Sequence, residues 1–275
     1  MPNTVNLLKQ LEQLRKSLII AMVYSDYGEM SDDDLDILHG VLLETLRKRK
    51  IENKVERIEL LLHSHGGDAN PAYRIANMIR LYCKEFRVII PRKAKSAATL
   101  LTLGADKIYL SKTAELGPID PLVSHPLMTG TLIPAMAVKA FIEEILPELM
   151  EKYGHEAAEY FLRVDYAHVG FCRQSTEVAK EYASRLLKKF HFKDDSESKI
   201  EEVVESLVSY PSHDFVIDYD EAKKIGLNVE LLDSRSEPLI LKLYENYKGQ
   251  LNDSVLIVES TESRREIKRP KKTIW

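Results

Sequence analysis

The chain has 275 residues, which is enough for one large α/β domain or for one domain with a helical appendage. Its 44% apolar and 30% charged residues are typical of a globular protein. A formal net charge of −4 argues against nucleic acid as the main partner, because the chain carries no domain-wide basic field. Cys83 and Cys172 form neither a CxxC motif nor a disulfide framework. We therefore expect both to be packing residues in a reduced, cytoplasmic setting.

No apolar run reaches the roughly 18 residues that a membrane span requires. Residues 1–17 have the pattern of an amphipathic helix and lack the long apolar core of a signal peptide. The apolar run at 18–24 is too short to span a bilayer and predicts a buried strand instead. The sequence therefore predicts a soluble protein without a membrane span.

The first part of the chain predicts a helix over residues 3–16, the strand at 18–24 and a second helix that ends near Arg49. Ser31 is a candidate N-cap for the second helix, because three aspartates follow it and negative charge suits the first turn. The cations at 47–50 suit the carboxyl end of the same helix.

A central unit follows, in which short apolar runs at 58–62, 86–90 and 108–110 alternate with two segments of helical period. This alternation predicts a βαβαβ unit with a parallel sheet. Small residues occupy both junctions from strand to helix, at 63–67 and 94–98. In open α/β sheets, ligands bind at the carboxyl ends of the strands, so we expect the active site to form from these two loops.

The rest of the chain is predicted to be mostly helical. In order we expect a helix from Pro134 to about 153, a helical insertion at about 154–210, a strand at 214–217, a helix at 218–225, a strand at 229–232, a helix at 238–249 and a strand-like run at 255–258. These elements divide the chain into a main domain, residues 1–235, and a C-terminal helix with a basic tail, residues 236–275. We interpret the tail as a solvated terminus rather than as an arm for acidic partners.

Two groups of residues in the junction loops are candidates for chemistry. Gly66 and Gly67 let the chain turn without steric cost, and their N–H groups could bind an anionic oxygen, although a plain turn would need glycines as well. Ser96 is predicted to begin a helix, where it could be a nucleophile or only an N-cap.

Four motifs match a known family in order and spacing: HSHGGD at 63–68, AKSAATL at 94–100, GADKIY at 104–109 and ELGPIDP at 115–121. Together they resemble the serine dehydrogenase proteinase family, which is related to Clp proteases, signal peptide peptidases and the archaeal stomatin-cleaving Ser–Lys peptidase. The resemblance spans about 18–121, resumes at 210–227 and covers roughly half of the chain. It implies an α/β fold of the Clp/crotonase type, a spiral of ββα units with a parallel sheet, here with an added C-terminal helical region. Residues 1–235 would then form the peptidase domain.

The resemblance implies a serine endopeptidase in which Ser96 attacks the peptide carbonyl. An N–H group of the Gly66–Gly67 pair and the N–H group of Ala97 would hold the oxyanion, and the edge at 67–69 could pair with substrate as an added strand. The expected partners are a protein or peptide substrate and further copies of the chain in a trimer, hexamer or larger ring. The apolar helix at 141–150 would suit contacts between subunits. No cofactor is expected.

The resemblance offers two candidates for the general base. Lys139 lies in an apolar stretch whose setting resembles that of the lysine in the Ser–Lys peptidases. Apolar surroundings favour the uncharged form of a lysine, which a base near neutrality requires. The alternative is His125, placed as in the Clp proteases, with Asp165 as the orienting carboxylate. We interpret His213 as a structural residue or as one that lies behind the site.

Two departures from the family pattern put activity, more than fold, in question. His65 stands where relatives usually have proline, and Ala98 stands where they usually have glycine. His63 and His65 form an HxH pair, but a third ligand is not evident in the sequence, so no metal site is predicted. The alternatives that remain are a crotonase-type acyl-CoA enzyme, with Lys93 and Lys95 on a nucleotide phosphate, and a non-catalytic oligomeric scaffold.

Overall fold

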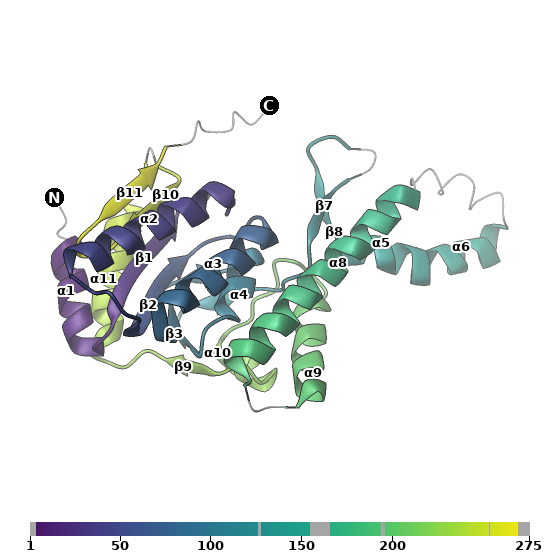
Figure 1. Cartoon of the computed structure of the whole chain (residues 1–275). Helices are drawn as coiled ribbons and strands as arrows, with labels where there is room; N and C mark the ends of the chain where they lie inside the picture. The colour runs from purple at the N-terminus through teal and green to yellow at the C-terminus, as the bar shows by residue number, and fades with distance from the viewer. Residues whose placement is uncertain (1–3, 126–127, 155–165, 194–195, 253, 269–275) are drawn as a thin grey trace.

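A seven-stranded sheet organises the molecule, in the order β11-β10-β1-β2-β3-β5-β9 (Figure 1). The computed structural model describes residues 4–125, 128–154, 166–193, 196–252 and 254–268. The strands of this sheet are β1 (Leu18–Tyr24), β2 (Val55–His63), β3 (Cys83–Ile90), β5 (Lys107–Leu110), β9 (Val229–Leu231), β10 (Leu256–Glu259) and β11 (Arg264–Ile267). Strands β1, β2, β3, β5 and β9 are parallel, whereas β10 and β11 are antiparallel to their neighbours. The predicted parallel βαβαβ unit is confirmed.

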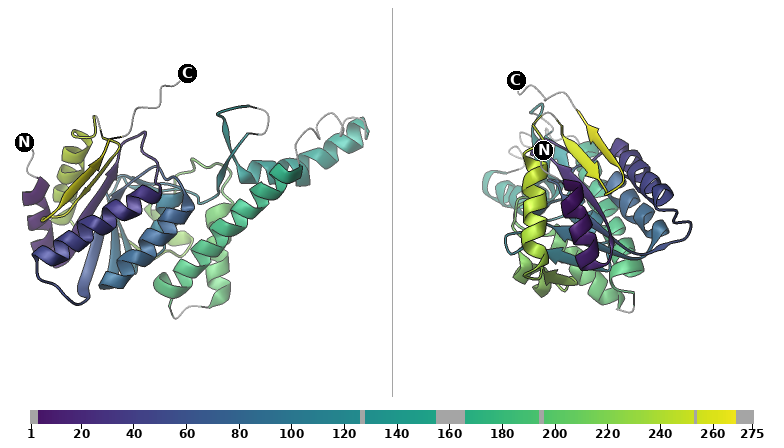
Figure 2. Two further views of the ribbon diagram at one scale, coloured as in Figure 1. Left: turned by 45° about the horizontal axis from the view of Figure 1, so that its top comes forward. Right: turned by 90° about the vertical axis from the view of Figure 1, so that its left-hand side faces the viewer.

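Helices cover both faces of this sheet, which explains why β1 reads as one continuous apolar run. Alternate residues of β1 point to opposite faces. Leu18, Ile20 and Met22 pack with α2 (Asp32–Lys48) and α3 (Ala69–Tyr82). The other face packs against α1 (Thr4–Arg15) and α11 (Ser236–Lys248). Figure 2 shows the two helix layers on either side of the sheet.

A second, smaller ladder crosses the carboxyl end of the main sheet. It consists of β4 (Lys93–Ala94) paired with β6 (Glu115–Leu116), extended by isolated bridges from Ala94 to Ser64 and from Leu116 to Ile217. The chain thus leaves β2, β3 and β5 and crosses this ladder once after each of them. That repetition is the spiral of ββα units that the resemblance implies.

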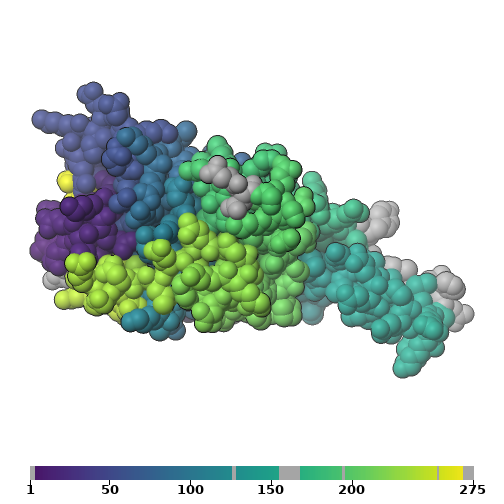
Figure 3. All heavy atoms as spheres, turned by 90° about the horizontal axis from the view of Figure 1, so that it is seen from below, coloured from purple at the N-terminus to yellow at the C-terminus, as the bar shows by residue number. Residues whose placement is uncertain are grey.

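The strand expected at 214–217 is wrong, because the chain meets the ladder there at Ile217 alone. The predicted helix from Pro134 forms as α5 (Ala135–Ala140), a π-helical turn η1 (Phe141–Ile145) and α6 (Leu146–Tyr153). The hairpin of β7 (Leu122–Ser124) and β8 (Leu132–Pro134) precedes it. We call residues 122–153 the arm, and Figures 1 and 3 show it extending away from the sheet.

The predicted helical insertion provides two main helices, α8 (Tyr166–Leu186) and α9 (Glu197–Val208), with a π-helical turn η2 (Leu187–His191) at the end of α8. The short helix α10 (Tyr219–Lys224) then leads into β9. Among the described residues, no helix has both the length and the apolar character that crossing a membrane requires.

The C-terminal segment belongs to the same sheet as the main domain. Strand β10 pairs with β1, and α11 packs beside α1. Within the segment expected to be a solvated basic tail, Arg264 lies in β11 and binds Glu259 and Glu266. Residues 269–275 of the tail lie outside the described residues.

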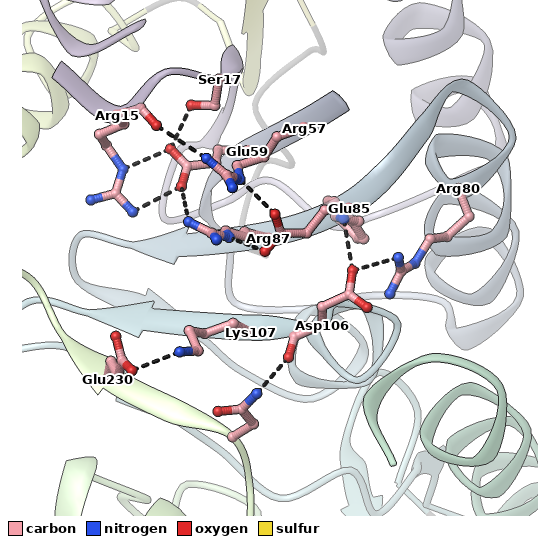
Figure 4. Close-up of polar contacts among 12 residues, drawn as sticks. Arg15, Ser17, Arg57, Glu59, Arg80, Glu85, Arg87, Asp106, Lys107 and Glu230 are labelled. Carbon is pink, nitrogen blue, oxygen red and sulfur yellow. Dashed lines mark hydrogen bonds and ion pairs between the residues drawn. The ribbon is translucent and has the colours of Figure 1, made fainter. Parts of the chain in front are cut away.

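Charged residues toward the amino ends of the parallel strands form a network of ion pairs (Figure 4). Glu59 on β2 is fully buried and accepts hydrogen bonds from Arg15 Nε at 2.6 Å and from Ser17 Oγ at 2.8 Å. Burial alone would raise the pKa of Asp106, but hydrogen bonds from Arg80 and Lys193 hold it below its usual range. Buried charges are normally paired in this way. The network ties the strands together far from their carboxyl ends, where the functional loops lie.

Candidate active site

Ser96 adopts a backbone conformation that serine rarely occupies. It precedes α4 (Ala97–Thr102) with φ of 52° and ψ of −122°, and its hydroxyl makes no capping hydrogen bond to that helix. Such a conformation costs about 1–3 kcal/mol and is typically found where function requires it. The role of a simple N-cap therefore does not explain Ser96.

The residue before Ser96 fixes the turn to two distant segments. Lys95 Nζ donates hydrogen bonds to Leu116 O and Phe215 O, both at 3.1 Å, and lies 3.3 Å from a carboxylate oxygen of Glu115. Its side chain is only 11% exposed. Lys95 therefore holds the Ser96 turn, the loop after β6 and the segment around Phe215 together.

Gly66 packs directly against Ser96, so the two predicted loops meet. A Cβ atom on Gly66 would lie 2.8 Å from Ser96 Cβ and 2.8 Å from Lys95 O, and its φ is +108°. Gly67 has φ of +139°, and a Cβ atom there would lie 2.2 Å from Met30 N. Both positions need glycine, for conformation and for space.

The amides of the glycine turn are not equally available. Gly66 N–H donates to Ser64 Oγ at 3.0 Å, while Gly66 O accepts from Met30 N–H. Within the part of the chain that the structure describes, no hydrogen bond is donated by Gly67 N–H or by Ala97 N–H. Both residues line the cleft that contains Ser96, so these two N–H groups are free to bind an anionic oxygen. Met30 pairs with one edge of this segment, through Gly66 O and Asp68 N–H. Pairing of a substrate strand with residues 67–69 stays a prediction.

Ser96 and the glycine turn line a cleft of about 1770 Å³. Its walls also include Ile119 and Pro121, Leu122 and Leu132 from the arm, and Phe171, Val178 and Tyr182 from α8. Ala98 does not line it, because its methyl group is buried within α4. The departure from glycine at that position therefore leaves the cleft unchanged.

A histidine–aspartate pair also belongs to this cleft. His213 lines it, and His213 Nδ1 lies 2.9 Å from Asp120 Oδ1. Asp120 is only 2% exposed. Hydrogen bonds from Ile119 N–H to Leu207 O and between Leu116 and Ile217 fix the two loops that carry this pair.

We interpreted His213 from the sequence as a structural residue and did not predict its contact with Asp120. The available signal was that Asp120 ends the ELGPID motif while His213 lies in the second block of the family resemblance. Both blocks therefore belong to one site.

The two expected bases both lie on the arm. Lys139 lies on α5 with its side chain 55% exposed and its Nζ 3.8 Å from Glu143 Oε2. His125 Nδ1 accepts a hydrogen bond from Met128 N–H in the arm. Among the described residues, the cleft lining includes neither of them, and Asp165 lies outside the described residues.

A model of the ClpP-like SDH-type serine proteinases matches residues 2–272. The chain belongs to this family. Two uncharacterized proteins of Methanocaldococcus jannaschii, MJ0137 and MJ1495, are 25% identical to it over 252 residues and 24% identical over 247 residues. Both alignments cover 88% of this chain, and they cover 78% and 76% of the relatives.

Solved structures similar to this family member include two peptidases. The 1510-N membrane-bound stomatin-specific protease has a TM-score of 0.48 at 16% identity, over 80% of this chain and 82% of that one. A peptidase from Plasmodium falciparum has a TM-score of 0.43 at 14% identity, over 83% and 99%. The family match confirms the predicted ClpP-like α/β fold and the predicted class, a serine proteinase acting on proteins.

The contact between Gly66 and Ser96 gives a first prediction. Replacing Gly66→Ala should lower the free energy of unfolding by about 1 kcal/mol more than Gly130→Ala, as measured by urea denaturation. Gly130 is the matched control, since it also has positive φ, +79°, but a Cβ atom there meets nothing within 4 Å. Equal destabilisation of the two variants would contradict the close packing of Gly66 on Ser96.

Proposed function

We propose that the chain is a serine endopeptidase in which Ser96 is the nucleophile and His213, oriented by Asp120, is the general base. One observation carries this proposal: a strained serine, packed on a glycine turn, shares one cleft with His213, which is paired with the buried Asp120. A serine hydroxyl needs a base to take its proton, and the base needs a third group to orient it.

In the proposed reaction, Ser96 Oγ attacks the peptide carbonyl carbon and its proton moves to Nε2 of His213. Asp120 accepts the hydrogen bond from Nδ1–H, fixes the tautomer and stabilises the imidazolium. The leaving amine then takes the proton from His213, which forms an acyl-enzyme on Ser96. A water molecule, deprotonated by His213, attacks the acyl carbon and releases the second product.

The oxyanion of the tetrahedral intermediate would accept hydrogen bonds from Gly67 N–H and Ala97 N–H. Within the described residues neither donor makes another hydrogen bond, and both residues line the cleft with Ser96. Gly66, also predicted for this role, has its N–H engaged by Ser64 Oγ. Its part in the proposal is to let the turn approach Ser96.

The Ser–Lys mechanism with Lys139 stays a prediction, but fewer observations support it than support His213 as the base. A base lysine needs an apolar enclosure that favours its uncharged form, whereas the Lys139 side chain is more than half exposed beside Glu143. His125 with Asp165 likewise stays an alternative. An acyl-CoA site is disfavoured, because Lys93 and Lys95 both lie near Glu115 rather than facing a free phosphate position.

The proposed substrate is an extended, largely unfolded polypeptide. The cleft volume of about 1770 Å³ exceeds the roughly 300–1,000 Å³ of small-molecule pockets. Leucine, valine and aromatic residues from the arm and from α8 line one side of it. These surfaces would favour peptides with apolar side chains.

A fluorophosphonate probe and an unfolded protein substrate test the mechanism. Wild type should be labelled and Ser96→Ala should not. His213→Ala should lower kcat/KM by about 10²- to 10⁴-fold, because proton transfer to a positioned base is lost. Lys139→Ala, the matched control at the rival base, should change kcat/KM by less than about threefold on the same physical argument.

Two outcomes would contradict the proposed residues. Equal labelling of wild type and Ser96→Ala would remove Ser96 from the mechanism. Loss of activity in Lys139→Ala, with activity retained in His213→Ala, would establish the Ser–Lys alternative.

We also infer that the chain forms a homo-oligomer through the arm. In α6 only Leu146 is buried, and Tyr153 of α6, Ile145 of η1 and Phe171 of α8 each expose about half of their surface. Where exposed apolar side chains form a patch, they mark contact sites between proteins. A trimer, hexamer or larger ring stays the expectation, as does a cytoplasmic location.

Changing Ile145→Asp together with Tyr153→Asp should lower the molar mass measured by size-exclusion chromatography with light scattering. Charge buried in an apolar interface without a partner is costly. The control is Leu81→Asp, since Leu81 is 69% exposed on α3, outside the arm. A monomeric wild type, or an unchanged mass in the double variant, would refute assembly through the arm.

A further inference from the structure

Three potential metal ligands converge where β1 and β2 end. Asp26 follows β1, His63 ends β2, and His65 lies two residues further on. One ligand atom from each side chain lies within 4.8 Å of the other two, and His65 Nε2 is 3.4 Å from Asp26 Oδ1. Sequence patterns could not reveal Asp26 as the third group, because only the parallel pairing of β1 with β2 brings it beside the HxH pair.

His63 provides an independent observation that points to a ligand here. It is only 3% exposed, and its Nδ1 atom is buried without a hydrogen-bond partner among the described residues. Its other ring nitrogen, Nε2, lies 3.3 Å from Tyr244 Oη. A buried polar atom without a partner costs about 1–3 kcal/mol and calls for an explanation.

The contact between His63 and Tyr244 suits a metal ligand. A neutral imidazole has a lone pair available for a metal ion. If Nε2–H donates to Tyr244 Oη, then Nδ1 carries that lone pair, and metal-binding histidines usually donate their second N–H in this way.

We propose that Asp26, His63 and His65 bind a Zn²⁺ ion. Zinc bonds of about 2.0–2.1 Å in a tetrahedron place the ligand atoms about 3.3 Å apart, close to the 3.4 Å between His65 and Asp26. All three ligand atoms lie within 4.8 Å of one another, so an inward movement of the side chains would complete this spacing. Two imidazoles with one carboxylate suit Zn²⁺ better than Mg²⁺ or Ca²⁺, which prefer oxygen ligands. Three protein ligands leave a fourth position, as in zinc sites that bind water or substrate.

The cations near this site do not prevent binding. Lys93 and Lys248 lie close enough to favour the neutral form of His63, and the Asp26 carboxylate acts in the opposite sense. The carboxylate would bind the metal directly, whereas the two lysines are not ligands. The charge of the bound ion is therefore partly neutralised by its own ligand.

The proposed ion lies in the same cleft as Ser96, because Asp26, His63 and His65 all line it. His65 directly precedes Gly66 and Gly67, so a metal bond to His65 would tie the glycine turn to the loop after β1. This consequence for catalysis rests on the proposed function, whereas metal binding itself does not.

The experiment is isothermal titration calorimetry with ZnCl₂ on tag-free, chelator-treated Ser96→Ala protein. It should bind one Zn²⁺ per chain and no Mg²⁺ at the same concentrations. Asp26→Asn and His65→Gln should each weaken Zn²⁺ binding by at least about 100-fold, since even outer-sphere partners are worth 10- to 100-fold. The control His39→Gln removes a partly buried histidine bonded to Tyr82 Oη and should leave the affinity unchanged.

Cobalt provides a second readout for the same variants. Co²⁺ bound in a tetrahedral site should give intense visible absorption that Zn²⁺ abolishes and that His65→Gln lacks. No zinc binding, or equal affinity in Asp26→Asn, His65→Gln and the starting protein, would overturn the proposed site.

The two proposals fail separately. Protein that binds Zn²⁺ but is not labelled by a fluorophosphonate at Ser96 would contradict the peptidase and leave the metal site standing. Labelled protein that binds no Zn²⁺ would contradict the metal site alone.

Discussion

The close packing of Ser96, whose φ is positive, against Gly66 determines the architecture of the site. Ser96 lines the cleft with a positive φ, and the turn that carries it leaves no room for a side chain on Gly66. The surrounding structure must supply the free energy that holds this conformation. A fully buried α4 and the buried strands around it provide that support.

The small crossing ladder explains how residues far apart in the sequence reach one cleft. Each crossing brings a loop to the carboxyl end of the main sheet, and Lys95 bonds to the backbone of two such loops at once. Asp120 and His213 lie just beyond those anchored points. The site is therefore a product of the spiral topology as much as of any single motif.

The sequence predicted the elements that local pattern determines. The apolar runs gave β1, β2, β3 and β5, and the small residues at two junctions located the loops that contain Ser96 and Gly66. Apolar periodicity identified the helices because each has one face on the core. The motifs identified the family, which the match over residues 2–272 confirms.

Contacts between side chains that are far apart in the chain could not be predicted from the sequence. His213 and Asp120 are 93 residues apart; both lie in blocks of the family resemblance, but neither block indicates that the two side chains meet. Asp26 reaches the HxH pair only through the register of two parallel strands. Lys139 lies in an apolar sequence, yet the arm leaves its side chain exposed, so composition alone misjudged its surroundings. Long-range contacts and solvent exposure are consequences of topology.

The most direct measurement is a crystal structure of the protein after reaction with a fluorophosphonate. The account predicts a covalent bond at Ser96 Oγ, with the phosphoryl oxygen about 3 Å from both Gly67 N and Ala97 N. The ring of His213 should face Ser96 while still bonded to Asp120. An adduct whose oxygen points away from these amides, or a Ser96 that stays unmodified while another residue reacts, would contradict the account.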